Sequence, residues 1–439
     1  MASDKKVCVL LFHRDLRIVD HRGLEAAIKT GAPILPLFVF TPEQVSADKN
    51  TLRSLNSVQF MLESLADLSS AIREKGGRMM FAYGQTENVL KSLAHRYDLC
   101  AVIETADYTP YALKRTETIK KTLSDLSGVE YIQVADSYLL EPGTATNKSG
   151  KTFQKFTPFY EAVRHRHIDE PSGTPSRISW ASLRVVGGGK HKTRKVRRAI
   201  PQEVTLEAMI GRLVLHPNKE IAIHGGRKEG LKLLAALPRD YAKIHDVPAM
   251  QTSMLSAHNH YGTLSIREVY AKGKTLDLTE FVRQLWWRDF YGHIMADFKG
   301  LYGVDAYEFQ RTPTHEQSAA SKKAFQDWCE AKTGVPLVDA GMTQLLCTGY
   351  MHNRVRLVVA SWLVKDMNVH WRFGERFFAK HLVDYDPAQN MMNWIWIASV
   401  LPFAQAPFRR IDAYRTAEKY DPDGTYIKRW LGDKTASPC

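Results

Sequence analysis

The chain has few cysteines and no long apolar segment. Its five cysteines are odd in number and include no CxxC pair, so neither a disulfide framework nor a zinc or iron–sulfur site is indicated. No signal peptide and no run of about 18 apolar residues is visible. Internal repeats and low-complexity tracts are also absent. We therefore expect a soluble intracellular protein of the cytoplasm or nucleus, with no metal site and no membrane partner.

Length and charge narrow the class of protein further. The 439 residues exceed one average domain, and 44% hydrophobic residues are enough for two cores. The formal net charge is +13 and the isoelectric point about 9.3. Such a charge favours a polyanionic partner, which is nucleic acid or an anionic membrane surface. We take nucleic acid as the better supported partner and expect a monomer.

The first 140 residues alternate short apolar runs with polar helical patterns. Residues 7–12 (VCVLLF) and 34–40 (ILPLFVF) are continuously apolar, as in strands that are buried on both faces. A helical pattern over 23–29 lies between them. Further strands are expected at 79–83, 99–104 and 129–134. This alternation predicts a doubly wound α/β domain with a parallel sheet over 1–140.

Residues 141–205 have the composition of a linker. PSGTPS, GGG and the basic run KHKTRKVRR follow one another between 171 and 198. The glycine run lacks the spacing of a phosphate-binding loop, which excludes a nucleoside triphosphate site. The basic run 190–198 has three open readings: a nuclear address, a contact with DNA phosphate, or a solvated loop.

From residue 206 onward the pattern is helical almost throughout, which predicts an all-α domain over 206–439. Amphipathic runs occur at 206–215, 228–236, 278–297, 320–331, 339–348, 354–368 and 374–383.

The stretch 349–396 places polar residues where apolar periodicity predicts buried helix faces. Buried polar groups need partners, so Arg356 and Asp384 must bond each other, their neighbours or a polar ligand. Asp386, Asn390 and Trp394 recur every four residues and share one helix face. Trp396 lies about 200° around the helix from Trp394 and faces another neighbourhood. A ligand between these helices is the favoured interpretation.

This stretch resembles the flavin-binding core of the DNA photolyase and cryptochrome family, closest to the class I photolyases of cyclobutane pyrimidine dimers. The resemblance implies an α/β antenna domain, a long linker and an all-helical FAD-binding domain. It also implies a second, light-harvesting chromophore in the crevice of the sheet, a deazaflavin, a flavin or a folate. HRDLR at 13–17 and DYTPYALKR at 107–115 match antenna-domain motifs. From residue types alone, HRDLR reads equally well as a polar loop with two exchangeable arginines.

The resemblance also assigns residues to FAD. Thr252, Ser253 and Ser256 lie just ahead of an expected helix, where hydroxyls can hold an anion. An ordinary helix cap is the simpler interpretation of this segment. Family members place the matching segment on the FAD pyrophosphate, pair an arginine with an aspartate beside the ring, and set a second aspartate on the pyrimidine edge. An asparagine faces N5, where an amide bonds the flavin without adding charge. The matching residues are Tyr241, Thr252, Ser253, Leu255, Ser256, Arg288, Arg356, Asp384, Asp386 and Asn390.

Two tryptophans match the family's electron relay to the flavin. Trp394 and Trp371 stand at the first two positions, but Ser318 stands at the third. Another aromatic residue, Trp328, Trp362 or a tyrosine, would then end the relay, or photoreduction would be slow.

The lesion pocket of the family has counterparts here with two departures. Trp287 and Trp396 match aromatic walls, Asn353 and Arg354 match polar contacts to the flipped lesion, and Arg410 matches a DNA contact. Gln284 stands where dimer photolyases carry glutamate, and Leu357 replaces methionine, so altered repair is expected. Photolyases of (6–4) lesions carry histidines at the positions of Asn353 and Leu357, which disfavours that activity.

These residues predict light-driven repair of cyclobutane pyrimidine dimers, with Trp394, Trp371, Asn390 and Gln284 as catalytic residues and damaged DNA as partner. A blue-light photoreceptor of the cryptochrome type, with little or no repair, is the alternative, which the expected lack of a signalling tail after 431 disfavours. A basic DNA-binding protein with a vestigial flavin site is the third. The H-N-H at 258–260 lacks further metal ligands and is expected to be incidental.

Overall fold

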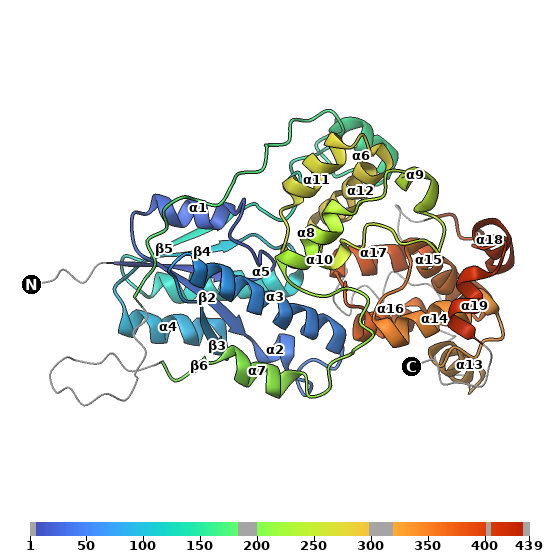
Figure 1. Ribbon diagram of the computed structural model, residues 1–439, viewed down its shortest axis with the longest axis horizontal. Helices are drawn as coiled ribbons and strands as arrows, with labels where there is room; N and C mark the ends of the chain where they lie inside the picture. Colours follow the sequence, from blue (N-terminus) through green and yellow to red (C-terminus); the bar gives the residue numbers. More distant parts are fainter. Residues whose placement is uncertain (1–5, 183–199, 298–318, 401–404, 433–439) are drawn as a thin grey trace, which may run out of the picture.

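The computed structural model describes residues 6–182, 200–297, 319–400 and 405–432. An α/β domain lies beside a domain built of helices (Figure 1). The sheet has the order β5-β4-β1-β2-β3-β6, and all neighbours pair in parallel except β6, which runs antiparallel to β3. The five predicted strands are confirmed to within one residue. The strands are β1 Val7–Phe12, β2 Ile34–Phe40, β3 Met80–Tyr83, β4 Leu99–Thr105, β5 Glu130–Val134 and β6 Glu203–Val204.

Both faces of the sheet are covered, as the continuous apolar runs predict. Every residue of β1 and β2 is buried. Alternate residues of β1 contribute to two separate cores, because successive side chains of a strand point to opposite faces. Helices α1 (Arg22–Lys29) and α3 (Leu55–Glu74) cover one face, and α4 (Thr86–Arg96) and α5 (Pro110–Ser124) cover the other. The short helix α2 (Pro42–Val45) follows β2.

The helical domain is built around one large core. The predicted helix over 354–368 is divided, because its last turn, η4 (Trp362–Asp366), has π-helical hydrogen bonding. The other helices of this part of the chain are α8 Arg227–Ala235, α9 Tyr241–Ile244, α10 Ser256–Tyr261, α11 Ile266–Thr275, α12 Thr279–Asp297, α13 Ala319–Cys329, α14 Pro336–Thr348, α15 Asn353–Ser361, α16 Trp371–His381, α17 Pro387–Ala398, α18 Ala413–Tyr420 and α19 Thr425–Leu431.

The expected linker contributes to both cores. Helix α6 (Phe156–Val163) buries Phe156, Phe159 and Val163 in the core of the helical domain, where it packs on α12. Strand β6 then extends the sheet, and α7 (Leu206–Leu213) packs on α3 in the α/β domain. The packing therefore divides the chain differently from the expected boundaries at residues 140 and 205. The basic run 190–198 lies outside the described residues.

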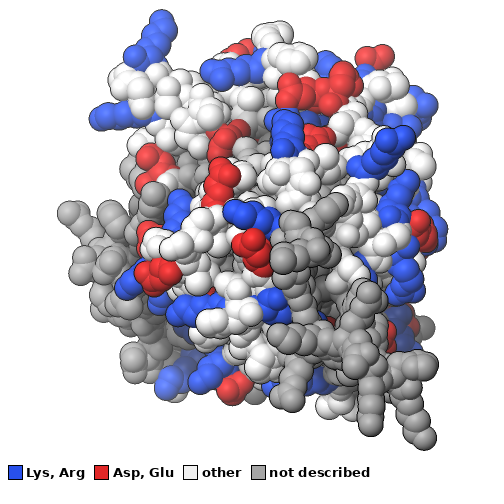
Figure 2. All heavy atoms as spheres, turned by 90° about the vertical axis from the view of Figure 1, so that its left-hand side faces the viewer, with Lys and Arg blue, Asp and Glu red and all other residues white. Residues whose placement is uncertain are grey.

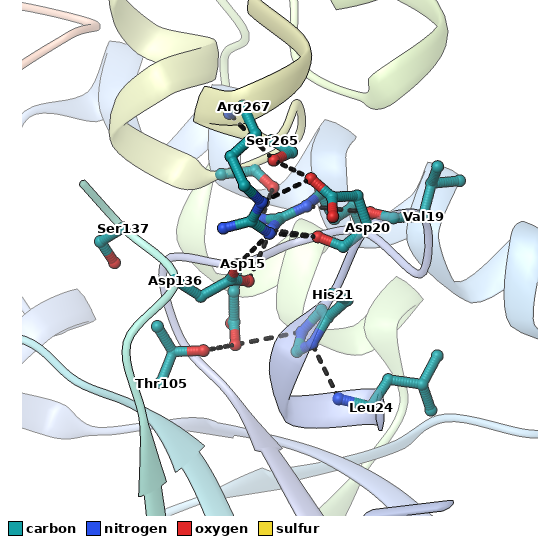
Figure 3. A network of polar contacts seen from close by, with 12 residues as sticks. Asp15, Val19, Asp20, His21, Leu24, Thr105, Asp136, Ser137, Ser265 and Arg267 are labelled. Atoms are coloured by element: carbon teal, nitrogen blue, oxygen red, sulfur yellow. Dashed lines mark hydrogen bonds and ion pairs between the residues drawn. The ribbon is translucent and has the colours of Figure 1, made fainter. Parts of the chain in front are cut away.

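Buried charges join the two domains. Arg267, at the start of α11, donates to the side chain of Asp20 over 3.0 Å and to Asp136 over 2.7 Å (Figure 3). Arg17 of the HRDLR segment bonds the same Asp136 and donates to the backbone oxygen of Gly262 over 3.2 Å. Two arginines and two aspartates thus balance one another in the buried interface, which limits the cost of burying them.

The described residues contain no membrane-spanning helix, and the face at the α/β end of the molecule is not continuously basic. No helix in the described residues is long and apolar enough to cross a membrane. On the α/β end of the molecule, the Lys and Arg side chains that the structure describes are interspersed with Asp and Glu (Figure 2). The net charge of +13 is therefore not gathered into a single patch on this face.

Candidate functional site

The helical domain contains a cavity bordered by α9, α10, α12, α15 and α17. About 1220 Å³ within it is free of protein atoms, including its open mouth. Apolar side chains line it together with a small set of polar ones, as is typical of cofactor sites. The polar and aromatic lining consists of Tyr241, Ser253, Ser256, Asn259, His260, Phe281, Gln284, Arg288, Tyr350, Asn353, Arg356, Phe378, Asp384, Asp386, Gln389, Asn390, Asn393 and Trp394.

Helix α17 presents one face to this cavity, as its sequence spacing predicts. Asn390 and Trp394 line the cavity, and Asp386 lies just ahead of the helix as its N-cap. The Asp386 Oδ1 atom accepts from the backbone N–H groups of Ala388 (2.9 Å) and Gln389 (3.3 Å). Trp396 lies outside the lining, under the guanidinium of Arg409 at 5.6 Å.

Arg356 and Asp384 form the expected ion pair in the cavity wall. One guanidinium nitrogen of Arg356 lies 2.8 and 3.0 Å from the two carboxylate oxygens of Asp384. The Nε atom of Arg356 also donates to the backbone oxygen of Met351 over 2.7 Å. The aspartate is almost completely buried and the arginine is 22% exposed. The pair therefore offers an oriented positive charge to the cavity.

Both carboxylate oxygens of Asp386 have protein partners. Its Oδ2 atom accepts from Arg14 and, over 3.0 Å, from Nδ1 of His260. With two bonds at Oδ1 as well, the four acceptor positions of the carboxylate are occupied. Burial alone would raise the pKa of Asp386, but Arg14 and His260 outweigh burial and hold the pKa well below its usual range. Asp386 is therefore an ionised helix cap in the cavity wall, and its direct contact with the pyrimidine edge stays a prediction.

Asn390 is held by a residue that the sequence interpretation missed. Its amide nitrogen donates to the backbone oxygen (3.3 Å) and to Oε1 (3.2 Å) of Glu375 in α16. Burial raises the pKa of Glu375, whose Oε1 also accepts from the hydroxyl of Tyr385 over 3.2 Å. The protein therefore fixes the nitrogen end of the Asn390 amide. No spacing rule connects residues 375 and 390, so the sequence carried no signal for this pair.

Only part of the predicted hydroxyl segment reaches the cavity. Ser253 and Ser256 line it, whereas Thr252 is not part of the lining and Leu255 is buried in the helical core. Leu255 is also the N-cap of α10 and provides no side-chain cap bond. Of the expected pyrophosphate segment, the two serines thus reach the cavity, and the cradle itself stays a prediction.

Two residues of the H-N-H segment contribute to the cavity wall, and no group of three or more His, Cys, Asp or Glu side chains that could hold a metal occurs among the described residues. Asn259 and His260 line the cavity. The Oδ1 atom of Asn259 is buried and accepts no hydrogen bond from the described residues. A buried acceptor without a partner is costly, so this atom indicates that a polar ligand completes the wall. Arg288 holds the same residue from the other side, because it donates to the backbone oxygens of Ser137 (2.7 Å) and Asn259 (3.2 Å).

The predicted lesion residues fall into two groups. Gln284, Asn353 and Leu357 line the cavity, and Asn353 is exposed at its mouth. The remaining predicted residues have protein partners and lie outside the lining: Trp287 stacks on Phe156 with ring centroids 3.7 Å apart, Arg354 pairs with Asp246 at 2.6 Å, and Arg410 pairs with Asp366 at 3.2 Å.

The two tryptophans predicted for the electron relay, Trp371 and Trp394, are buried. Trp394 contacts Phe378 and Trp328 edge to face, with ring centroids 5.1 and 6.3 Å apart. Trp371 begins α16, and its indole N–H is buried without a hydrogen-bond partner among the described residues. Trp328 donates to the backbone oxygen of Val359 and is completely buried, so it cannot be the surface end of a relay. Ser318 lies outside the described residues.

A second cavity lies between the carboxyl ends of the strands and the helical domain. About 1630 Å³ within it, including its mouth, is free of protein atoms. Both antenna-like motifs reach it, HRDLR through His13 and Arg14 and DYTPYALKR through Asp107, Tyr111 and Arg115. The reading of HRDLR as a loop with exchangeable arginines is wrong, because Arg14 and Arg17 have different buried partners. His260 lines both cavities.

Comparison with known proteins finds similarity in both domains, and the relatives below align with almost the whole chain. Residues 8–176 match the family model described as DNA photolyase, and 281–438 match the FAD binding domain of DNA photolyase. A deoxyribodipyrimidine photo-lyase of Streptomyces griseus is 30% identical over 97% of this chain and 89% of its own, and one of Vibrio cholerae is 31% identical over 96% and 89%.

Solved structures agree. The crystal structure of an archaeal photolyase from Sulfolobus tokodaii with two FAD molecules is 32% identical, with a TM-score of 0.82 over 98% of this chain and 92% of its own. A bacterial class III photolyase from Agrobacterium tumefaciens is 28% identical, with a TM-score of 0.83 over 98% and 87%. A Synechocystis cryptochrome shares the fold at 23% identity, with a TM-score of 0.81 over 100% and 91%.

Proposed function

The chain belongs to the DNA photolyase family, and we propose that it repairs cyclobutane pyrimidine dimers in DNA by light-driven electron transfer from reduced FAD. The enzyme class, deoxyribodipyrimidine photo-lyase, is that of its relatives. The choice of lesion and of class I within the family is our proposal. It rests on residues in and around the cavity of the helical domain.

One observation carries the assignment of FAD to this cavity. The buried oxygen of Asn259 lacks a partner in the part of the chain that the structure describes, at a wall shared with the Arg356–Asp384 pair and Asn390. A flavin dinucleotide supplies polar edges and an anionic pyrophosphate to such a wall. Ser253, Ser256 and Arg356 would hold the anionic and ring portions, and the chemistry that FAD supplies when bound is the donation of one electron upon illumination.

Asn390 suits a reduced flavin. Because Glu375 and the backbone hold the amide nitrogen, the amide oxygen is the end that remains to accept a hydrogen bond from the cofactor. An uncharged acceptor at that position bonds a protonated ring nitrogen without adding a charge to the cavity.

The lesion would enter beside Gln284, Asn353 and Leu357, which line the same cavity. An amide from each of Gln284 and Asn353 can bond the carbonyl groups of a flipped pyrimidine pair. Leu357 gives apolar contact to the methyl side of the bases. A histidine that could protonate a (6–4) lesion stands at neither Asn353 nor Leu357.

We propose the second cavity as the site of a second chromophore. The Nε and Nη2 atoms of Arg115 are buried there without hydrogen-bond partners among the described residues, although Nη2 lies 3.8 Å from Glu104. An anionic chromophore of the flavin type would satisfy them. The Sulfolobus tokodaii photolyase with two FAD molecules gives this choice a precedent. Chromatography of the chromophores released by denaturation, with deazaflavin and folate standards, tests it.

A light-dependent repair assay tests the main proposal. Oligonucleotides with a single cyclobutane dimer or a single (6–4) lesion are incubated with chemically reduced protein in blue light and in the dark. We expect restoration of the dimer substrate only, and only in light. Repair of the (6–4) substrate would overturn the lesion assignment. FAD-bound protein that repairs neither would favour the photoreceptor.

A further inference from the structure

Arg14 belongs to the α/β domain but makes its strongest contacts with the helical domain. One guanidinium nitrogen donates to Oδ2 of Asp386, and Nε donates to the backbone oxygen of His260 over 3.1 Å. A third nitrogen lies 3.5 Å from Asp107 of the α/β domain. The side chain is only 15% exposed. Arg14 lines the second cavity. Its partner Asp386 lines the cavity of the helical domain, which is called the flavin cavity from here on because we propose FAD as its occupant.

The carboxylate that Arg14 contacts organises the flavin cavity. Asp386 caps α17, whose first turns carry Asn390 and Trp394 into the cavity. It also orients His260, whose ring lines both cavities. A charged group that fixes the cap therefore fixes the start of α17 and the imidazole together.

The approach of the two domains at this point is close. The backbone N–H of Leu16 donates to the oxygen of Tyr261 over 3.0 Å. Gly262 has a φ of 60°, and a Cβ atom at this position would lie 2.2 Å from the backbone oxygen of Arg14. The position of Arg14 is thus determined by backbone contacts on both sides and not only by its own ion pair.

Arg17, three residues further along the same loop, provides a natural comparison. It is equally a buried interdomain arginine, but its partners are Asp136 and the backbone oxygens of Val19, Asp20 and Gly262. None of these residues lines the flavin cavity. Loss of Arg17 weakens the docking of the domains without touching the cap of α17.

We propose that Arg14 is a positioning residue of the flavin site: through Asp386 and His260, the α/β domain sets the geometry of the cavity in the helical domain. The inference rests on the proposed function, because it takes FAD as the occupant of that cavity. It goes beyond it by making FAD binding depend on a residue of the other domain. Antenna and flavin domains are then coupled through a side chain as well as through light.

The test compares Arg14→Met with Arg17→Met in the full-length protein. Methionine keeps the length of the arginine stem but removes the charge and the donors. Measurements are the FAD dissociation constant by recovery of flavin fluorescence, the visible circular dichroism of bound FAD, and the Tm of the apoprotein. We expect both variants to lower Tm. Only Arg14→Met should weaken FAD binding, by at least tenfold, and change the dichroism of the flavin.

The outcomes separate the two proposals. Wild-type apoprotein that does not bind FAD overturns the proposed function. Wild-type binding with an Arg14→Met affinity within twofold of it, or with an equal loss in Arg17→Met, overturns the role of Arg14 alone. If Arg14→Met does not fold, Arg14→Lys provides the test. A single ammonium group cannot bond both Asp386 and the His260 carbonyl in the way that a guanidinium does. The FAD affinity of Arg14→Lys should therefore fall below that of the wild type, but by less than the tenfold loss expected for Arg14→Met. An unchanged affinity in a folded Arg14→Lys protein, with unchanged dichroism, would also reject the inference.

Discussion

The indole of Trp394 lies directly against Gly374, where a Cβ atom would be only 2.2 Å from its Cη2 atom. Trp394 thereby rests on the backbone of α16, the helix that Trp371 begins. If Trp394 is the immediate electron donor, Trp394→Phe should lower photoreduction of oxidised FAD at least tenfold while chemically reduced protein still repairs. The rate of photoreduction is measured from the absorbance of oxidised FAD under steady blue light. Trp328→Phe is the control, and a loss in that variant instead would route the electron through Trp328.

Removal of Asp384 should empty the flavin cavity. Asp384→Ala leaves the Arg356 guanidinium without its carboxylate, and breaking a buried pair costs about 3–5 kcal/mol, toward the lower end here because Arg356 is 22% exposed. We expect less than a tenth of the wild-type ratio of FAD to protein, read from the absorbance spectrum. Asp384→Asn, which keeps an acceptor, should retain more FAD. Full occupancy in the alanine variant would show that the pair does not serve the cofactor.

The glutamine at the lesion side is open to a direct comparison with the family. Gln284→Glu introduces a group that can offer a proton to the lesion, which an amide cannot do. We expect a several-fold higher quantum yield of dimer repair with an unchanged dark affinity for dimer-containing DNA. A variant in which neither quantity changes would mean that Gln284 does not contact the lesion.

Asn353 and Arg410 should affect DNA binding in different ways. Asn353 lines the cavity, so Asn353→Ala should remove most of the preference for dimer-containing over undamaged DNA. Arg410 is 63% exposed and shares its charge with Asp366, so Arg410→Ala should weaken both substrates about equally and reduce the salt slope by about 1. Dark binding titrations at several salt concentrations measure both. If Asn353→Ala keeps its preference for dimer-containing DNA, Asn353 does not contact the lesion in the cavity.

Asp289 should make the stability depend on pH. Burial raises its pKa to about 7, and its Oδ1 atom has no hydrogen-bond partner among the described residues. Because the folded pKa exceeds the unfolded value of 3.8, the free energy of unfolding should fall as pH rises from about 4 to about 7. Asp289→Asn, which still accepts from the Leu140 N–H, should remove up to about 4 kcal/mol of this dependence. Parallel pH profiles of Tm in both proteins would exclude Asp289 as the cause.

The sequence predicted the elements that depend on local patterns. Continuous apolar runs located five strands, and the spacing of Asp386, Asn390 and Trp394 located the face of α17 that lines the cavity. Helix α6 had a readable signal in the spacing of Phe156, Phe159 and Val163, which the linker composition around it concealed.

Other features depend on how distant segments meet. Arg14 and Asp386 are 372 residues apart, and no local sequence pattern indicates that they pair. Docking of the two domains decides whether the acceptors of Asp386 are free, because Arg14 of the α/β domain occupies one of them. Packing of α6 on α12 within the helical core decides whether Phe156 covers a face of Trp287. Several of the lesion and flavin residues taken from family resemblance line the cavity, and their roles stay predictions. The protein partners that others of them have could not be read from residue types.

The path of the chain between the two cores limits how the protein can be divided. It leaves the α/β core to bury α6 in the helical core, returns for β6 and α7, and leaves again for the remaining helices. A fragment that ends at residue 140 lacks a strand and a helix of its own core, and a fragment that begins at residue 206 leaves Phe290 without its Phe156 and Phe159 contacts. Neither half is a transferable module, so heat should melt the two domains in one cooperative transition rather than in succession.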